Sequence, residues 1–392
     1  MVSHWVAQVL REWLAASLRR PPSPEACLRE TIGWLMRAQD ATPDPGIARA
    51  FDLRSGWQPS YPETTGYIVP TFLAYARAYG APSARDRAVS MARWLLDVQL
   101  PCGGIPAGTV EQVEKVPTVF NTGMVILGWI AAWEETGDEA FLHAACRAGE
   151  WLCDIQDDDG AWRRGGSPRV GNQVNTYNAR VAWALAQLFR VTGDRAFCDA
   201  AVRNLRWVLS QQQENGWFRN NDFRRNDRPW IHTIAYAARG LLEGGVVLGD
   251  EAFVAAARRT ADAVLSTQKP DGRLAARYRA DWTGEQWGGC LPGHAQMAVL
   301  WFRLGKITGD ARYGRAARRT LLYLVRHVNL RHRHPGIRGG LKGSHPMWRR
   351  YGRYQYPNWG AKFLADALMA PGNSTSGRQG GSVPGKIAAA GR

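Results

Sequence analysis

Residues 147–162 read RAGEWLCDIQDDDGAW, and the elements of this phrase return along most of the chain. The phrase joins the end of an amphipathic helix to a glutamine, an acidic turn, a glycine and a tryptophan. A glutamine followed four residues later by a glycine occurs at Gln99/Gly103, Gln156/Gly160, Gln212/Gly216 and Gln268/Gly272. Successive glutamines are 57, 56 and 56 residues apart, and Gln39 lies 60 residues before Gln99. This single period predicts a repeat protein whose units share one continuous core.

A second marker follows the same period and separates consecutive repeats. It is a Gly-Asp pair that occurs as Thr136-Gly137-Asp138, Thr192-Gly193-Asp194, Gly249-Asp250 and Thr308-Gly309-Asp310. We expect its glycine to adopt the left-handed conformation that ends one helix. The aspartate is expected to cap the helix that follows.

Helical segments of two kinds alternate along this period. One kind has a charged face and is predicted for residues 24–39, 85–99, 139–156, 195–213, 251–268 and 311–328. The other kind is apolar almost all round, as buried helices are, and is predicted for residues 64–79, 120–135, 177–191, 232–245, 293–307 and 357–370. Outer and inner helices in alternation predict an all-α fold, the (α/α)6 toroid, with an open α-solenoid as the alternative.

The toroid is expected to form a single domain over residues 21–370. Residues 1–20 alternate Trp, Val and Leu with Arg and Glu, which predicts an extra amphipathic helix at the N-terminus. Residues 371–392 are rich in Gly and Ser and are predicted to be a disordered tail. The links from outer to inner helices are long, roughly 17 to 28 residues, and loops of such length usually carry function. All of these loops belong to the N-terminal end of the inner helices.

The chain is basic and rich in aromatic residues, with a formal net charge of +16 and 18 tryptophans. Such a surface suits a polyanion, and we favour an acidic glycan over nucleic acid or a membrane surface. An Arg-rich composition also follows genomic base composition, so the charge is a weaker indication than the repeat. The six cysteines have no metal-ligand spacing and are predicted to be small buried hydrophobic residues. We therefore predict no metal and no cofactor.

Targeting signals and membrane spans are not recognisable. The N-terminal segment is amphipathic rather than continuously apolar, and no stretch approaches about 18 uncharged apolar residues. We therefore predict a cytoplasmic protein without a membrane span. The sequence makes no prediction of the oligomeric state.

Aligning the inner helices places polar residues at one register near their N-termini, around the axis of the predicted ring. The expected catalytic residues are Glu63, His232, His294, Tyr67 and Tyr177. Glu63 is the best-placed carboxylate, and histidine titrates nearest neutrality. Substrate binding is predicted for Asn121, Asn178, Arg180, Tyr236, Gln296, Trp287, Asn358, Trp359 and Lys362. Arg180 and Lys362 are the most informative, because a cation one turn inside a buried helix needs a partner or a ligand.

Structural roles are an alternative for several of these residues. Good helix N-caps in this group are Thr64, Asn121, Asn178 and Asn358. A histidine on a helix is more often a satisfied core residue than a catalytic one. Cys290 and His294 have a spacing that would suit zinc, but no third ligand is apparent. The acidic residues 157–159 lie inside the repeated turn and are predicted to be structural, while carboxylates of the long loops are second candidates: Asp222, Asp227, Asp281 and Glu285.

The repeated phrase resembles the QW motif of terpene cyclases and related toroids. The matching residues are Arg147, Trp151, Leu152, Gln156, Gly160 and Trp162. In that family the glutamine bonds to the backbone at a helix end and the aromatic residue packs between repeats. Three further copies end in Phe218, Ile105 and Leu274 instead of tryptophan, and the DxDD proton donor of class II cyclases is absent.

The chain as a whole resembles bacterial six-hairpin toroid proteins associated with polysaccharide synthesis and processing, which are often labelled prenyltransferase-like. The resembling segments are residues 61–67, 175–180, 232–236, 290–296 and 356–362. The wider superfamily includes glycoside hydrolases, unsaturated glucuronyl hydrolases, polysaccharide lyases and sugar epimerases. The resemblance therefore implies a carbohydrate-active enzyme and leaves the reaction open.

These observations favour an enzyme that acts on an acidic, uronate-containing glycan at the mouth of the ring. The last long loop, residues 331–356, adds seven Lys or Arg residues and no acid, which indicates anion binding. A lyase or epimerase needs a base such as His232, His294 or a tyrosine, with cations that neutralise the uronate. A hydrolase needs two opposed carboxylates, of which only Glu63 is well placed. A terpene-cyclase or prenyltransferase relative and a non-catalytic glycan-binding toroid are the alternatives.

Overall fold

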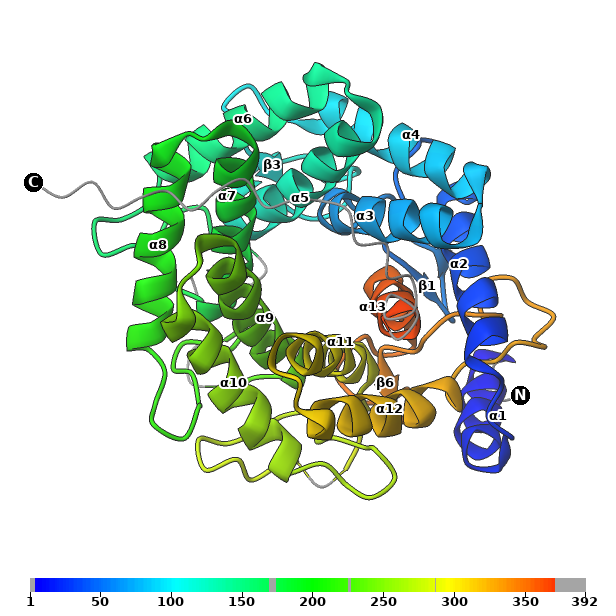
Figure 1. The fold of residues 1–392 in the computed structure, drawn as a ribbon. Coiled ribbons are helices and arrows are strands. Elements are labelled where there is room, and N and C mark those ends of the chain that lie inside the picture. Colours follow the sequence, from blue (N-terminus) through cyan, green and yellow to red (C-terminus); the bar gives the residue numbers. More distant parts are fainter. Residues whose placement is uncertain (1–3, 169–173, 225–226, 286, 371–392) are drawn as a thin grey trace, which may run out of the picture.

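Two concentric layers of helices alternate along the chain in the computed structural model, which describes residues 4–168, 174–224, 227–285 and 287–370 (Figure 1). The outer helices are α2 (Pro24–Asp40), α4 (Pro82–Val98), α6 (Glu139–Asp154), α8 (Arg195–Ser210), α10 (Glu251–Ser266) and α12 (Ala311–Val325). The inner helices are α3 (Pro62–Tyr79), α5 (Val119–Thr136), α7 (Ala179–Thr192), α9 (Ile231–Leu248), α11 (Leu291–Thr308) and α13 (Asn358–Met369). Each helix overlaps the segment predicted for it, and each lies in the predicted layer.

The inner helices close into a ring. Neighbouring inner helices pack in order from α3 to α13, and α13 then packs on α3 and on the first outer helix, α2. Strand β1 (Ala50–Asp52) pairs with β7 (Gln355–Pro357) and so joins the first repeat to the last. The predicted (α/α)6 toroid is therefore confirmed, and the open solenoid is excluded.

Close backbone contacts hold the inner layer together. A Cβ at Gly128 of α5 would lie 2.3 Å from the carbonyl oxygen of Gly66 in α3. A Cβ at Gly240 of α9 would lie 2.2 Å from the carbonyl carbon of Ala179 in α7. Glycine is required at these positions because any side chain would push the two helices apart.

Each repeated glutamine joins its own outer helix to the next one. The amide nitrogen of Gln156, which follows α6, donates to the carbonyl oxygens of Gly160 at 3.1 Å and Ala200 at 3.0 Å. Its oxygen accepts a hydrogen bond from Arg203 of α8 at 2.7 Å. A carbonyl acceptor and an arginine donor on the next outer helix recur at Gln99, Gln212 and Gln268. We call the glutamine, the glycine four residues later and the backbone they contact the glutamine strut.

The glycine of each strut lies against the backbone of the same neighbouring helix. Gly160 has φ +88°, and a Cβ there would lie 2.4 Å from the carbonyl oxygen of Arg203. Comparable φ values, 84° to 91°, occur at Gly103, Gly216 and Gly272. A further copy closes the ring without a glutamine. There, Gly339 after α12 has φ +83°, and a Cβ on it would lie 2.2 Å from the carbonyl oxygen of Glu30 in α2.

The Gly-Asp marker forms the short turns, as predicted. Its glycines end four inner helices with φ between 69° and 74°, at Gly137, Gly193, Gly249 and Gly309. Each following aspartate accepts a hydrogen bond from the amide two residues later, at 2.9 to 3.1 Å. The acidic turn is also structural, because Asp157 and Asp159 both pair with Arg163. Hydrogen bonding to Arg163 lowers the pKa of Asp159 to about 2.

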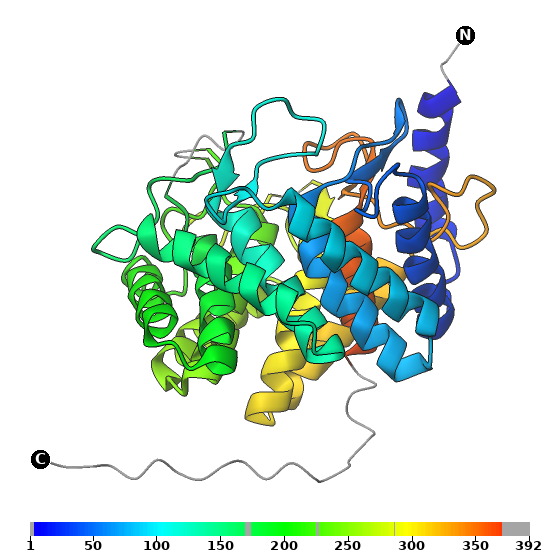
Figure 2. The ribbon, with the colours of Figure 1, turned by 90° about the horizontal axis from the view of Figure 1, so that it is seen from above.

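The long loops gather on one side of the ring, where the inner helices begin (Figure 2). Short antiparallel strands brace them. They pair β1 with both β2 (Gly56–Trp57) and β7, β3 (Ile105–Pro106) with β4 (Pro117–Thr118), and β5 (Gly289–Cys290) with β6 (Ser344–His345). A 3₁₀ turn, η1 (Thr176–Asn178), leads directly into α7.

Helix α1 (His4–Leu18) lies outside the ring beside α2 (Figure 1). Trp5 contacts Tyr354 with ring centroids 5.0 Å apart, and Trp13 contacts Trp348 at 5.7 Å, so α1 packs on the last long loop. Among the described residues, no helix is both long and apolar enough to cross a membrane. The predicted disordered tail, residues 371–392, lies outside the described residues.

The strut glycine should be more sensitive to substitution than a glycine of the short turns. We predict that Gly160→Ala lowers the free energy of unfolding by about 3 kcal/mol, because the left-handed φ and the collision with Arg203 both add cost. Gly193→Ala is the matched control. Gly193 has φ +74° and nothing within 4 Å of its Cβ position, so the loss there should be about 1 kcal/mol. Urea unfolding followed by tryptophan fluorescence measures both, and equal losses would refute the strut contact.

Candidate active site

Side chains from the inner helices, from the turn η1 and from the last long loop meet near the axis of the ring, where the inner helices begin. Each is less than one-tenth exposed, and the set comprises Tyr67, Tyr177, Arg180, His232, Tyr236, Gln296, Tyr351 and Lys362. His232 lies against Tyr236 with ring centroids 4.4 Å apart and against Tyr351 at 5.1 Å. Glu63, in the first turn of α3, raises the pKa of Tyr67, Tyr177 and Tyr236 through its charge, so it belongs to the same group. We call this group the axial cluster.

Arg180 is a buried cation surrounded by aromatic rings. Its guanidinium carbon lies 4.8 Å from the ring centroid of Tyr236, 5.4 Å from Trp183 and 5.7 Å from Phe363. Within the described part of the chain its one hydrogen bond runs from Nε to the sulfur of Met124 at 3.4 Å, and it has no carboxylate partner. Burial lowers its pKa. An arginine remains charged even so, and its donors are therefore available to an anion.

Glu63 is held by a neighbour on its own chain segment. The hydroxyl of Tyr61 donates to Oε2 of Glu63 at 2.5 Å. Burial raises the pKa of Glu63 to about 7, although Tyr61, Arg49 and Arg180 act in the opposite direction. The carboxyl group is therefore poised to exchange a proton near neutral pH, as a general acid must.

His232 is neutral at physiological pH. Burial and the charge of Arg180 lower its pKa to about 3. Its Nδ1 lies 2.7 Å from Nε2 of Gln296 in the next inner helix. With the amide nitrogen facing the ring, Nδ1 accepts and Nε2 carries the proton, whereas half a turn of the amide exchanges these roles. Gln296 therefore selects the tautomer of His232.

The four tyrosines of the axial cluster serve as hydrogen-bond donors. Burial raises the pKa of Tyr67, Tyr177, Tyr236 and Tyr351 above the usual value. The phenols therefore keep their protons at neutral pH and are able to donate to the oxygens of a polar ligand. Tyr177 is also positioned by Phe120 and Phe223, whose rings it meets edge-on.

Lys362 has a partner on its own helix. Its ammonium pairs with Asp366, four residues on, at 2.5 Å. Burial lowers the pKa of Lys362 to about 8. Lys362 therefore has the partner that a buried cation needs, and its predicted role in substrate binding stays a prediction.

His294 is a structural residue, contrary to its predicted catalytic role. The side chain is completely buried, and its Nδ1 lies 2.7 Å from the carbonyl oxygen of Cys290. Its Nε2 accepts a hydrogen bond from the backbone of Leu274 at 2.9 Å. Both ring nitrogens are therefore engaged, and neither is open to a substrate or a zinc ion. No group of three or more His, Cys, Asp or Glu side chains in the described regions is arranged to bind a metal.

Three predicted binding residues also prove to have other surroundings. The amide of Asn121 donates to the carbonyl oxygen of Pro106 at 2.8 Å. The amide of Asn358 donates to Ala48 and to Thr64, at 3.0 and 2.7 Å. The hydrogen bonds of Asn121 and Asn358 therefore connect loops to the inner helices. The side chain of Trp287 is 78% exposed and so stands apart from the axial cluster.

The N-cap alternative is wrong for the inner helices. No side-chain cap hydrogen bond occurs at the start of α3, α5, α7 or α13. Asn178 occupies the N-cap position of α7, is buried and makes no such bond, so its predicted role in binding stays open. Trp359 stays a binding candidate too. Its indole nitrogen donates to the hydroxyl of Tyr351 at 3.1 Å, and Arg49 lies over its ring.

Some residues near the axis escaped prediction. Tyr351 comes from the last long loop, which has no register with the repeats. Asp366 is detectable in hindsight from its four-residue spacing to Lys362. Asp222 was a second candidate and is 9% exposed. Burial is the main cause of the raised pKa of Tyr177, and the charge of Asp222 raises it further, which places this carboxylate near Tyr177.

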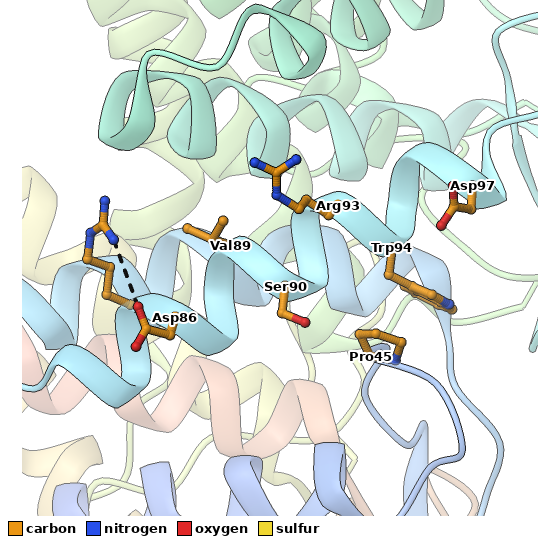
Figure 3. A pocket seen from close by; sticks show the side chains of 8 residues that line it. Pro45, Asp86, Val89, Ser90, Arg93, Trp94 and Asp97 are labelled. Atoms are coloured by element: carbon orange, nitrogen blue, oxygen red, sulfur yellow. Dashed lines mark ion pairs between the residues drawn. The ribbon is translucent and has the colours of Figure 1, made fainter.

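A groove on the outer surface is unrelated to this site. It has a volume of about 430 Å³ and lies along the outer helix α4 next to Pro45 (Figure 3). Its charged residues include Arg85, which pairs with Glu135, and Arg93, which pairs with Asp138. These charges are compensated by neighbouring helices.

Comparison with known proteins finds a family match over part of the chain and several solved structures with the same toroid fold. The sequence profile of the GH127 β-L-arabinofuranosidase catalytic domain matches residues 107–270. Similar solved structures include an unsaturated glucuronyl hydrolase specific for heparin, with a TM-score of 0.71, 14% identity and coverage of 90% of this chain and 97% of that one. Cellobiose 2-epimerase from Bacillus thermoamylovorans has a TM-score of 0.69 at 12% identity and covers 93% and 98%. No curated protein sequence matches the chain.

The buried Glu63 carboxyl makes stability depend on pH. Its pKa of about 7 in the folded protein exceeds the ordinary value of 4.5, so its contribution is fully present below about pH 4.5 and is lost as the pH rises through 7. We predict that wild type loses roughly 1 to 3 kcal/mol relative to Glu63→Gln between about pH 5 and pH 8. Urea unfolding at both pH values measures this difference. Substitution of the exposed Glu114 by Gln is the control, and a pH-independent difference for Glu63→Gln would contradict the assignment.

Proposed function

We propose that this protein is a carbohydrate-active enzyme that acts on an acidic, uronate-containing glycan at the axial cluster. The observation that carries the proposal is Arg180, a buried guanidinium without a carboxylate partner among the described residues. A planar guanidinium matches a carboxylate with two parallel hydrogen bonds. The carboxylate of a uronic acid supplies such a group, and the surrounding rings suit the faces of a sugar.

The cluster also holds a proton donor and a proton acceptor in suitable states. Glu63, with a pKa of about 7, carries its proton over much of the neutral range. His232 is unprotonated there, because burial and Arg180 depress its pKa to about 3. A substrate carboxylate paired with Arg180 would offset that positive charge, so binding itself would make His232 more basic.

These roles favour proton abstraction next to the carboxylate. With the amide oxygen of Gln296 turned toward Nδ1, His232 would use Nε2 to remove the proton from the carbon that bears the carboxylate, while Arg180 stabilises the charge that develops on the carboxylate oxygens. In a lyase the bond between the adjacent ring carbon and the glycosidic oxygen then breaks, Glu63 protonates that oxygen, and a double bond remains between the two carbons. In an epimerase the proton returns to the opposite face and no bond to oxygen breaks.

Hydrolysis is the second candidate, and Asp222 is the observation that favours it. Glycoside hydrolysis uses two carboxyl groups, one as acid and one as base or nucleophile. Besides burial, the charges of Glu63 and Asp222 both raise the pKa of Tyr177, so each carboxylate lies near that tyrosine. The solved structures that resemble this chain include both glucuronyl hydrolases and an epimerase.

An isoprenoid substrate suits the cluster poorly. A terpene-cyclase or prenyltransferase site encloses hydrocarbon, whereas this one carries a carboxyl group, an imidazole and a guanidinium. Desolvating these groups against a hydrocarbon chain would be costly. A non-catalytic glycan-binding toroid shares the chemistry of the site and is separated from the enzyme by the experiment below.

Activity on a panel of uronate polymers and oligosaccharides tests the proposal. We expect Glu63→Gln and His232→Ala to lower kcat by about 100-fold or more, because each removes a proton-transfer group. The matched controls are Glu114→Gln and His143→Ala, since both residues are exposed. Absorbance from a new conjugated double bond indicates a lyase. New reducing ends without that absorbance indicate a hydrolase, and deuterium uptake from heavy water without cleavage indicates an epimerase.

Two results would overturn the proposal. If no uronate substrate is converted but the glycans bind, the site is a binding site only. Full activity in both Glu63→Gln and His232→Ala would mean that the chemistry takes place elsewhere.

A further inference from the structure

A second buried polar cluster lies outside the ring, beneath helix α1. Glu12 of α1 is 2% exposed, and Lys342 of the last long loop is completely buried. Arg19, at the end of the α1 segment, and Asn329, after α12, complete its polar rim. None of these residues belongs to the axial cluster or takes part in the proposed reaction.

The charges of this cluster are only weakly paired. Among the described residues, Nζ of Lys342 makes one hydrogen bond, to the backbone carbonyl oxygen of Glu12 at 3.4 Å. Oε1 of Glu12 accepts hydrogen bonds from Asn329 at 2.8 Å and from Arg19 at 3.4 Å. Two cations therefore face one carboxylate, which leaves the cluster with one excess positive charge.

Five polar atoms of this region lack any hydrogen-bond partner within the described residues. They are Oε2 of Glu12, Nη1 of Arg19, Nδ1 of His327, Nδ1 of His345 and the hydroxyl of Tyr356. His327 is 4% exposed and Tyr356 is 1% exposed, so bulk solvent does not provide hydrogen-bond partners for their polar atoms. Buried polar atoms are almost always hydrogen-bonded, and so many unpaired atoms in one place call for an occupant.

These atoms belong to one group. The imidazole rings of His327 and His345 are 4.3 Å apart. After burial, the charge of Lys342 is the largest influence that lowers the pKa of both histidines. The charges of Glu12 and Arg19 likewise act on the phenol of Tyr356. The unpaired atoms therefore lie in one region, between α1, the end of α12 and the last loop.

We propose that these residues, the α1 cluster, bind a small oxyanion that carries a proton, of the chemical class of inorganic phosphate. Lys342, Arg19 and Tyr356 offer donors to its oxygens, and a neutral histidine offers one more. The excess positive charge is balanced by the anion. The unpaired Oε2 of Glu12 is an acceptor and requires a ligand that itself has an O–H group.

The unpaired carboxylate oxygen Oε2 of Glu12 determines which oxyanion the α1 cluster prefers. Phosphate carries at least one hydroxyl near neutral pH and donates it to Oε2 of Glu12. Sulfate has the same shape and no proton, so its oxygen would face the carboxylate oxygen in repulsion. The cluster therefore prefers phosphate to sulfate, and the bound anion links α1 to the last long loop.

Calorimetric titration of the full chain with inorganic phosphate and with sulfate tests this proposal. We expect wild type to bind phosphate at least tenfold more tightly than sulfate at matched ionic strength. Tyr356→Phe removes one donor without changing the packing and should weaken phosphate binding roughly fivefold to tenfold. Glu12→Gln should bind both anions with similar affinity, because the glutamine side chain can turn its amide nitrogen toward sulfate. Lys115→Met, on an exposed loop, is the control and should behave as wild type.

The calorimetric results distinguish a phosphate site from the alternatives. Absence of phosphate binding to wild type, or equal binding of phosphate and sulfate, would overturn the proposal. So would unchanged phosphate affinity in Tyr356→Phe. Lys342→Met is a further variant that should abolish binding, and Tyr356→Phe carries the test if that variant fails to fold. Because the α1 cluster is separate from the axial cluster, none of these results depends on the proposed enzymatic function.

Discussion

The contact between a glutamine strut and the next outer helix is the constraint on which the rest of the structure depends. The glutamine satisfies a carbonyl group in the body of that helix, and the glycine presses the chain against its backbone. Each outer helix is thereby set at a fixed angle to its neighbour. The chain leaves every strut from an equivalent point, so the long loops emerge on one side and return to the axis in register. Polar side chains at the starts of the inner helices converge for this reason.

The side chains of the axial cluster are buried, and their burial explains their protonation states. Desolvation raises the pKa of Glu63 to about 7 and lowers that of His232 to about 3, which leaves an acid that is protonated and a base that is not. The charge of Arg180 adds to the downward shift of the His232 pKa and opposes the upward shift of the Glu63 pKa. Among the described residues, the Arg180 guanidinium lies against aromatic rings and has no carboxylate partner. Its positive charge is therefore not balanced by an anion in that part of the chain.

The sequence predicted the fold well because the relevant interactions are repeated. The Gly-Asp turn acts within a few residues of its own position, and each strut glutamine and glycine contacts the neighbouring repeat, so their shared period reports the architecture directly. The closing strut at Gly339 was missed because it lacks the glutamine and its partner, Glu30, lies at the other end of the chain. The alignment of the inner helices by the repeat was enough to predict which residues lie near the axis, namely Glu63, Tyr67, Arg180, His232 and Tyr236. It could not distinguish His232 from His294, because the difference lies in bonds to Leu274 and Cys290 that only the folded loops create. The position of Tyr351 near the axis could not be predicted either, because it also depends on how the loops fold.

The central claim is that the unpaired charge of Arg180 selects an acidic sugar. Calorimetric binding of a uronate oligosaccharide and of its neutral counterpart, to wild type and to Arg180→Met, tests it most directly. The account predicts that wild type binds the uronate at least about tenfold more tightly, as a charged hydrogen-bonded pair requires, and that Arg180→Met binds both sugars alike. Equal affinity of wild type for the two sugars, or a preference that survives the loss of Arg180, would contradict it.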